Sequence, residues 1–162
     1  MRRIPVLLFA CWLLVPTAHA RESLGVFGAW GTFRDAEIPR CYAIAQPTRA
    51  SSGGARWNAF ATVSNWPKRG IRGQFHARLS REAKPGAPVY LSVGERRFAL
   101  TSGRADAWSQ DRRMDAAIIA AMRSAPTMSI EGRDRRGSRF FDLYVLSGAA
   151  TAMDAAALGC AR

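Results

Sequence analysis

Cysteine and histidine are the residues of this chain whose side chains and spacing could support catalysis, metal binding or a disulfide. Cys41 lies in the alternating stretch EIPRCYAIAQP (37–47), and Cys160 lies close to the C-terminal end in ALGCAR. A thiolate can attack a substrate beside a histidine base, ligate a metal ion or form a disulfide. The third cysteine, Cys11, falls in an apolar N-terminal stretch, so the chemistry open to Cys41 depends on the fate of that stretch.

The N-terminal stretch has the three parts of a secretory signal peptide. Two arginines at positions 2–3 precede an apolar run over residues 4–15, and the sequence AHA follows at 18–20. The apolar run has about 12 residues, whereas a membrane-spanning helix needs about 20. The sequence therefore predicts cleavage after residue 20 and an exported protein, periplasmic or secreted, with no transmembrane segment.

Cleavage would leave Cys41 and Cys160 as an even pair in an oxidising compartment, where pairing is expected. The alternative of a catalytic thiolate has His76 as its one histidine partner, because His19 would be lost with the signal peptide. A structural zinc ion needs four Cys or His ligands, and only three would remain. We predict a disulfide between Cys41 and Cys160, with no metal ion and no other cofactor.

Acid–base catalysis has weak support. His76 lies in GQFHARLSR (73–81), a stretch that alternates as a half-buried strand does. The alternation places Phe75, Ala77 and Leu79 inward, and Gln74, His76, Arg78 and Ser80 on the solvent face. Asp35 and Glu37 could form a carboxylate pair, but a salt-bridged surface is the simpler interpretation, and no motif such as G-x-S-x-G is present. We expect no catalytic residues; a small envelope hydrolase that uses His76 or a carboxylate is the alternative.

Basic residues are in large excess. Lys and Arg number 24 against 12 Asp and Glu, and the net charge of +12 would fall to about +10 after cleavage, enough to attract polyanions. Two predicted turns concentrate this charge as candidate anion-binding residues: Lys68, Arg69 and Arg72 in one, and Arg133, Arg135, Arg136 and Arg139 in the other. Exposed arginines can bind phosphate or carboxylate in a bidentate manner, although polar turns need no ligand. Predicted partners are anionic lipid, lipopolysaccharide, acidic polysaccharide or another envelope protein, and not nucleic acid, for which no motif is present.

The elements that must position these residues are mainly β-strands. Strands are predicted over 26–33, 40–46, 57–65 and 73–81, and hairpins over 88–102 and 127–147, while 48–56 has the composition of a loop. Two segments have helical spacing instead. Residues 111–125 are capped by Ser109 or Asp111 and stopped by Pro126, and 148–159 form an alanine-rich helix that delivers Cys160 to the core. The sequence predicts one domain over 21–162, a β-sandwich or small barrel of about seven strands with two short helices.

Three segments, taken in order, resemble the invasion-associated locus B family of exported bacterial proteins. GAWGTFRDAEIPRCYAIAQP (28–47) is similar to the family's opening tryptophan strand and cysteine strand. RMDAAIIAAMRSAPTMSIEGRDRRGSRF (113–140) resembles a later helix, strand and glycine turn, and LYVLSGAATAMDAAAL (143–158) resembles the closing strand and helix. The resemblance implies an exported β-rich domain and transfers no catalytic residue.

The chain also departs from that family. Thr32, Phe33 and Arg34 stand where the family has a cysteine after the first tryptophan, and TSGRADAWSQD (101–111) lacks a central cysteine pair. A single long-range disulfide would replace the family's framework. Together these features predict a non-enzymatic binding or structural protein of the cell envelope that contacts anionic envelope or host surface components. An exported inhibitor, or a specific protein partner in the periplasm, is the alternative.

Overall fold

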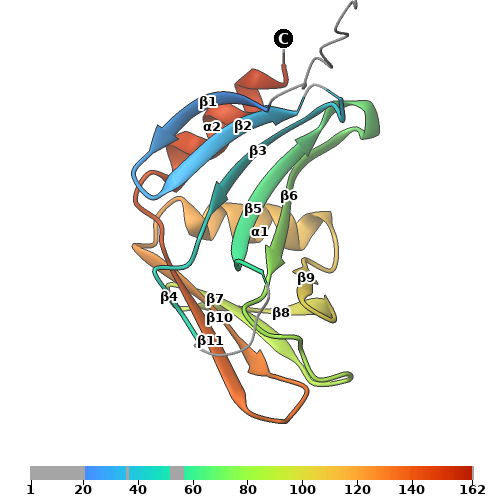
Figure 1. Ribbon diagram of the computed structural model, residues 1–162. Coiled ribbons are helices and arrows are strands. Elements are labelled where there is room, and N and C mark those ends of the chain that lie inside the picture. Colours follow the sequence, from blue (N-terminus) through green and yellow to red (C-terminus); the bar gives the residue numbers. More distant parts are fainter. Residues whose placement is uncertain (1–20, 36, 52–56, 162) are drawn as a thin grey trace, which may run out of the picture.

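A computed structural model describes residues 21–35, 37–51 and 57–161 (Figure 1). The predicted signal peptide (1–20) and the end of the predicted loop (52–56) lie outside the described residues. In the described part of the chain, no helix is long and apolar enough to cross a membrane.

Eleven strands of the described residues form one antiparallel sheet, in the order β1-β2-β3-β5-β6-β9-β8-β7-β10-β11-β4. Their bounds are β1 Glu22–Phe27, β2 Trp30–Asp35, β3 Arg40–Ala45, β4 Arg49–Ala50, β5 Phe60–Trp66, β6 Ile71–Arg78, β7 Val89–Val93, β8 Arg96–Gly103, β9 Asp106–Trp108, β10 Thr127–Arg133 and β11 Arg139–Val145. The sheet changes course at β8, whose first residues pair with β7 and whose last residues pair with β9. We call the part from β1 to β9 the first half-sheet and the part from β7 to β4 the second half-sheet. Figure 1 shows the first above the second.

Both half-sheets contribute to one hydrophobic core. Along β6, Phe75 and Ala77 are fully buried, as their alternation predicts, and Leu79 just beyond the strand is buried too. The second half-sheet adds side chains of β7, β10 and β11, among them Leu91, Ile130 and Phe140. Successive side chains of a strand point to opposite faces of the sheet. The polar residues that alternate with these core residues therefore point to the outer faces.

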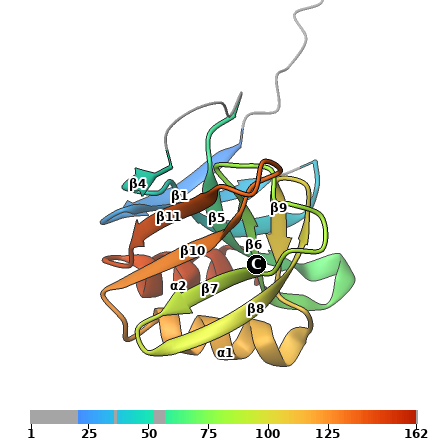
Figure 2. The same cartoon turned by 90° about the horizontal axis from the view of Figure 1, so that it is seen from below.

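Two helices lie on the same side of the first half-sheet, behind it in Figure 1 and beneath it in Figure 2. Helix α1 (Arg112–Met122) starts at the predicted cap, because the Asp111 side chain accepts a hydrogen bond from the Met114 amide at 2.8 Å. Helix α2 (Ala149–Gly159) packs on β1, β2 and β3 through alanines that are fully buried. Their small size lets the helix approach the sheet closely, and the Thr32 hydroxyl donates to the Ala152 carbonyl at 3.1 Å.

The predicted β-rich class with two helices is confirmed, but several details were wrong. Residues 26–33 hold a turn between β1 and β2, which Gly28 allows by its φ of 55°. The strand β9 was missed, and β4 lies in the predicted loop. Ser80 is buried and not on the solvent face, because β6 ends at Arg78 and the Ser80 amide then turns inward to donate to the Asp142 carboxylate at 2.9 Å.

Candidate functional site

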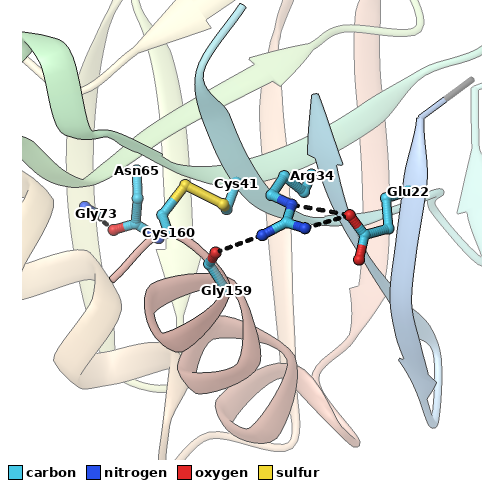
Figure 3. Close-up of a disulfide and its surroundings, with 7 residues drawn as sticks. All are labelled: Glu22, Arg34, Cys41, Asn65, Gly73, Gly159 and Cys160. Atoms are coloured by element: carbon cyan, nitrogen blue, oxygen red, sulfur yellow. Dashed lines mark hydrogen bonds and ion pairs between the residues drawn. A yellow bond between two sulfur atoms is a disulfide. The ribbon is translucent and has the colours of Figure 1, made fainter. Parts of the chain in front are cut away.

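The predicted disulfide between Cys41 and Cys160 is present (Figure 3). Cys41 is fully buried in β3, and Cys160 follows the last residue of α2. Arg34 holds the same helix end, because its guanidinium donates to the Gly159 carbonyl at 3.4 Å and pairs with Glu22 at 2.5 Å. A cation is favourable beside the carbonyls that end a helix. The C-terminal turn of α2 is thus attached to β2 and β3 by a covalent bond and by an arginine.

The first predicted basic cluster lies beside this disulfide, on the turn between β5 and β6 and at the start of β6. A short 3-10 helix, η1 (Pro67–Arg69), makes the turn, with proline at its start and Gly70 in the left-handed conformation at its end. The three basic residues of the cluster, Lys68, Arg69 and Arg72, are all exposed. Trp66 contacts the Arg69 guanidinium, which lies 5.0 Å from the centre of its ring.

The position of this turn is set by two contacts behind it. The Asn65 side chain accepts a hydrogen bond from the Gly73 amide at 3.0 Å and so bridges an irregularity in the β5–β6 pairing (Figure 3). Gly73 has a φ of +72°, and a Cβ there would collide with the Ile119 side chain of α1. Glycine therefore lets α1 pack directly against the strand that carries Arg72.

The turn and the end of α2 enclose a groove of about 440 Å³, which we call the disulfide-end groove. Its lining residues are Asn65, Pro67, Gly70, Ile71 and Arg72 from the turn and Ala157, Leu158, Cys160 and Ala161 from the helix end. Most of them are apolar, and the Leu158 side chain is 66% exposed. Of these residues, the sequence pattern indicated Arg72 and Cys160, each separately, and gave no functional indication for Ile71 and Leu158. The sequence does contain one indication, because Leu158 is a large apolar residue at the end of a helix that is otherwise rich in alanine.

The second predicted basic cluster lies at the opposite end of the molecule, on the β10–β11 hairpin (Figure 1). All four of its arginines are exposed, but they have different surroundings. Arg135 pairs with Glu82 at 3.1 Å, and this hydrogen bond is the main reason that the pKa of Glu82 is lowered. Arg136 lies on the turn itself, where the Asp134 side chain accepts hydrogen bonds from the Arg136 and Ser138 amides at 2.9 Å.

Arg133 and Arg139 face each other directly across the β10–β11 pair. With Tyr90, Arg97 and Glu131 they line a groove of about 390 Å³ on the second half-sheet, which we call the hairpin groove. The Arg97 guanidinium lies 4.0 Å from the Tyr90 ring centre and 2.9 Å from Glu131. The two basic clusters therefore do not form one site; each borders a groove of its own.

His76 lies on the outer face of the first half-sheet, as predicted, but it is half-buried among aromatic rings. Its ring stacks on Trp108 with centroids 5.4 Å apart, and its Nε2 is 3.0 Å from Asp106, which also accepts from Arg78 at 2.6 Å. Burial lowers the pKa of His76 more than the Asp106 carboxylate raises it, so at neutral pH the contact is a hydrogen bond of neutral imidazole.

A catalytic triad would also need a nucleophile at the second nitrogen of His76. Thr62 pairs with His76 across β5 and β6, but its hydroxyl donates to the His76 carbonyl oxygen at 3.3 Å. Asp106 is shared with Arg78, which suits a surface ion pair. This geometry adds no support to the hydrolase alternative. Similarly, Asp35 pairs with Arg40 at 2.8 Å and Arg21 at 3.4 Å, in keeping with the predicted salt-bridged surface.

The second half-sheet contains a buried carboxylate that was not predicted from the sequence. Asp142 is fully buried, and one of its oxygens, Oδ1, has no hydrogen-bond partner among the residues described. Burial raises the pKa of Asp142, and burial followed by the nearby Asp142 charge raises that of Tyr144. The signal was visible in RFFDLYV (139–145), where alternation places the aspartate inward between Phe140 and Tyr144.

Among the described residues, no group of three or more His, Cys, Asp or Glu side chains could hold a metal ion. Comparison of the chain with protein-family models, with curated proteins and with solved structures finds no match. A function can therefore be inferred only from the charges and grooves of this fold.

Proposed function

We propose that this protein is a non-enzymatic binding or structural component of the cell envelope that contacts anionic envelope components through its exposed basic turns. The observation that carries the proposal is the direct opposition of Arg133 and Arg139 in the hairpin groove. Like charges directly opposite each other on neighbouring strands destabilise a sheet. An anion placed between the two guanidinium groups would relieve that repulsion.

The surroundings of this arginine pair suit an anion. Arg97 is kept in place by Tyr90 and Glu131, so less side-chain freedom is lost when it binds a ligand. Arg133 keeps one contact to its own turn, because its Nη1 donates to the Gly137 carbonyl at 2.9 Å. In the described part of the chain, Arg139 makes no ion pair. A phosphate or carboxylate could therefore accept bidentate hydrogen bonds here without displacing a carboxylate from Arg139.

Export to the periplasm or beyond belongs to the same proposal. The chain carries a signal-peptide pattern over 1–20, and disulfides such as the one between Cys41 and Cys160 persist in oxidising compartments. The resemblance to the invasion-associated locus B family would place the protein in the same class and stays a prediction. In that compartment the polyanions within reach are lipid headgroups, lipopolysaccharide and acidic polysaccharide.

The test measures binding of the oxidised protein, residues 21–162, to phosphatidylcholine vesicles with and without phosphatidylglycerol, at low and high salt. The double variant Arg133→Gln/Arg139→Gln should bind the anionic vesicles less tightly by about fivefold for each charge removed. The matched control is Arg112→Gln/Arg113→Gln, which removes two exposed charges from the start of α1. Equal losses in both variants would mean that only net charge matters.

Two further outcomes would overturn the proposal. Binding to anionic vesicles that is indifferent to salt would contradict an electrostatic contact. Salt-resistant, stoichiometric retention of one envelope protein, with no affinity for anionic vesicles, would favour the alternative of an inhibitor or a specific protein partner.

A further inference from the structure

The disulfide-end groove differs in chemistry from the hairpin groove. The hairpin groove is lined by three arginines, a glutamate and a tyrosine, together with Pro88, Gly132 and Phe140. The disulfide-end groove is lined mostly by apolar groups, and no acidic residue is among those that line it. Arg72, at the start of β6, is among its lining residues, and the exposed Lys68 and Arg69 lie on η1 between the lining residues Pro67 and Gly70. An apolar floor beneath a positive rim fits a ligand with an apolar and an anionic part.

We propose that the disulfide-end groove binds an anionic lipid, with one acyl chain in the groove and the headgroup phosphate at Lys68, Arg69 and Arg72. This inference rests on the proposed function and names a ligand class for one of the two basic ends. A soluble acidic polysaccharide would use the charges but would leave Leu158 and Ile71 in water. A lipid uses both, because its acyl chain covers the leucine, which is 66% exposed, while its phosphate accepts from the basic rim.

Both walls of the groove are held in place before any ligand arrives. On one side the Asn65–Gly73 hydrogen bond fixes the turn, and on the other the disulfide fixes Cys160 at the end of α2 (Figure 3). A preformed groove avoids the cost of ordering its walls when the ligand binds. Each acyl methylene buried there should raise affinity about fourfold, and each basic side chain should contribute about fivefold.

The test uses dihexanoyl phosphatidylglycerol as dissolved monomers, its headgroup glycerophosphoglycerol, and the oxidised protein of residues 21–162. Titrations followed by amide NMR shifts should show the lipid binding at least about tenfold more tightly than the headgroup, with shifts at Ile71 and Leu158. Leu158→Gln should weaken the lipid severalfold and leave the headgroup unchanged. Val26→Gln is the matched control, because Val26 is 72% exposed on β1 and lies outside the groove.

The charged rim is tested in the same titrations. The triple variant Lys68→Gln/Arg69→Gln/Arg72→Gln should lose both lipid and headgroup, whereas Lys84→Gln/Arg112→Gln/Arg113→Gln, which removes three exposed charges elsewhere, should lose neither. Equal affinity for lipid and headgroup, with no effect of Leu158→Gln, would overturn the acyl-chain site while leaving anion binding intact. Absence of binding to either probe, together with no affinity for anionic vesicles, would overturn both proposals. Unchanged thermal unfolding of each variant shows that the losses are not caused by misfolding.

Discussion

The loss of stability on removing the disulfide between Cys41 and Cys160 can be calculated from the length of the loop that the bond closes. The bond closes a loop with a sequence separation of 119 residues. The chain-entropy model assigns such a loop about 4.9 kcal/mol of stability at 25 °C, because the cross-link restricts the unfolded chain. For a domain of this size, that loss would lower the melting temperature by roughly 10–20 °C.

The folded state should survive without the bond. The Thr32 hydroxyl still binds the Ala152 carbonyl, Arg34 still reaches Gly159, and the buried alanines of α2 still pack on the sheet. The last turn of the helix loses only its covalent attachment. We therefore expect Cys41→Ala/Cys160→Ala to keep the native circular dichroism spectrum while its urea midpoint falls.

The assay is urea unfolding of the oxidised protein and the variant, followed by tryptophan fluorescence. Oxidised protein of residues 21–162, which does not contain Cys11, should show no free thiol before reduction and two afterwards. The single variant Cys160→Ala removes the cross-link and leaves the buried Cys41 side chain in place, so its difference from the double variant measures packing alone. A loss below about 1 kcal/mol in the single variant would refute the loop-entropy argument.

Two further predictions concern buried and strained positions. Because burial raises the pKa of Asp142, the folded state holds its proton more tightly than the unfolded state, and stability should fall as pH rises from near 3.8 through the raised pKa. Asp142→Asn should weaken this pH dependence of the free energy of unfolding and should be at least as stable as the wild type at neutral pH. Urea unfolding at several pH values from about 3.8 upward measures both effects. An unchanged pH dependence in the variant would contradict the raised pKa of Asp142. Gly73→Ala should cost about 1–3 kcal/mol for its left-handed backbone, and more because its Cβ meets Ile119. Gly86→Ala is the control, because Gly86 has a similar φ of +75° and a Cβ there would have nothing within 4 Å. Equal losses of stability in the two variants would show that the contact between Gly73 and Ile119 of α1 is unimportant.

Local patterns in the sequence predicted most of the secondary structure. The alternation around Phe75 and Ala77 and the capped run after Asp111 each depend on neighbouring residues, and both are present where expected. The two strands that were not predicted, β4 and β9, share a physical cause. β9 pairs with β6 as well as with its neighbour β8, and β4 pairs with β11, so each of these short strands has a partner distant in the sequence. A segment this short has no periodicity of its own.

The sequence by itself determined the compartment prediction, the β-rich class and the pairing of Cys41 with Cys160, because signal-peptide pattern, alternation and cysteine count are local or compositional properties. Only the tertiary structure decided that the basic turns lie at opposite ends, and that Arg133 opposes Arg139. It also decided that Leu158 and Arg72 line one groove, although 86 positions separate them. The register of strands and the docking of α2 create these neighbours, and both result from long-range packing that no local pattern records.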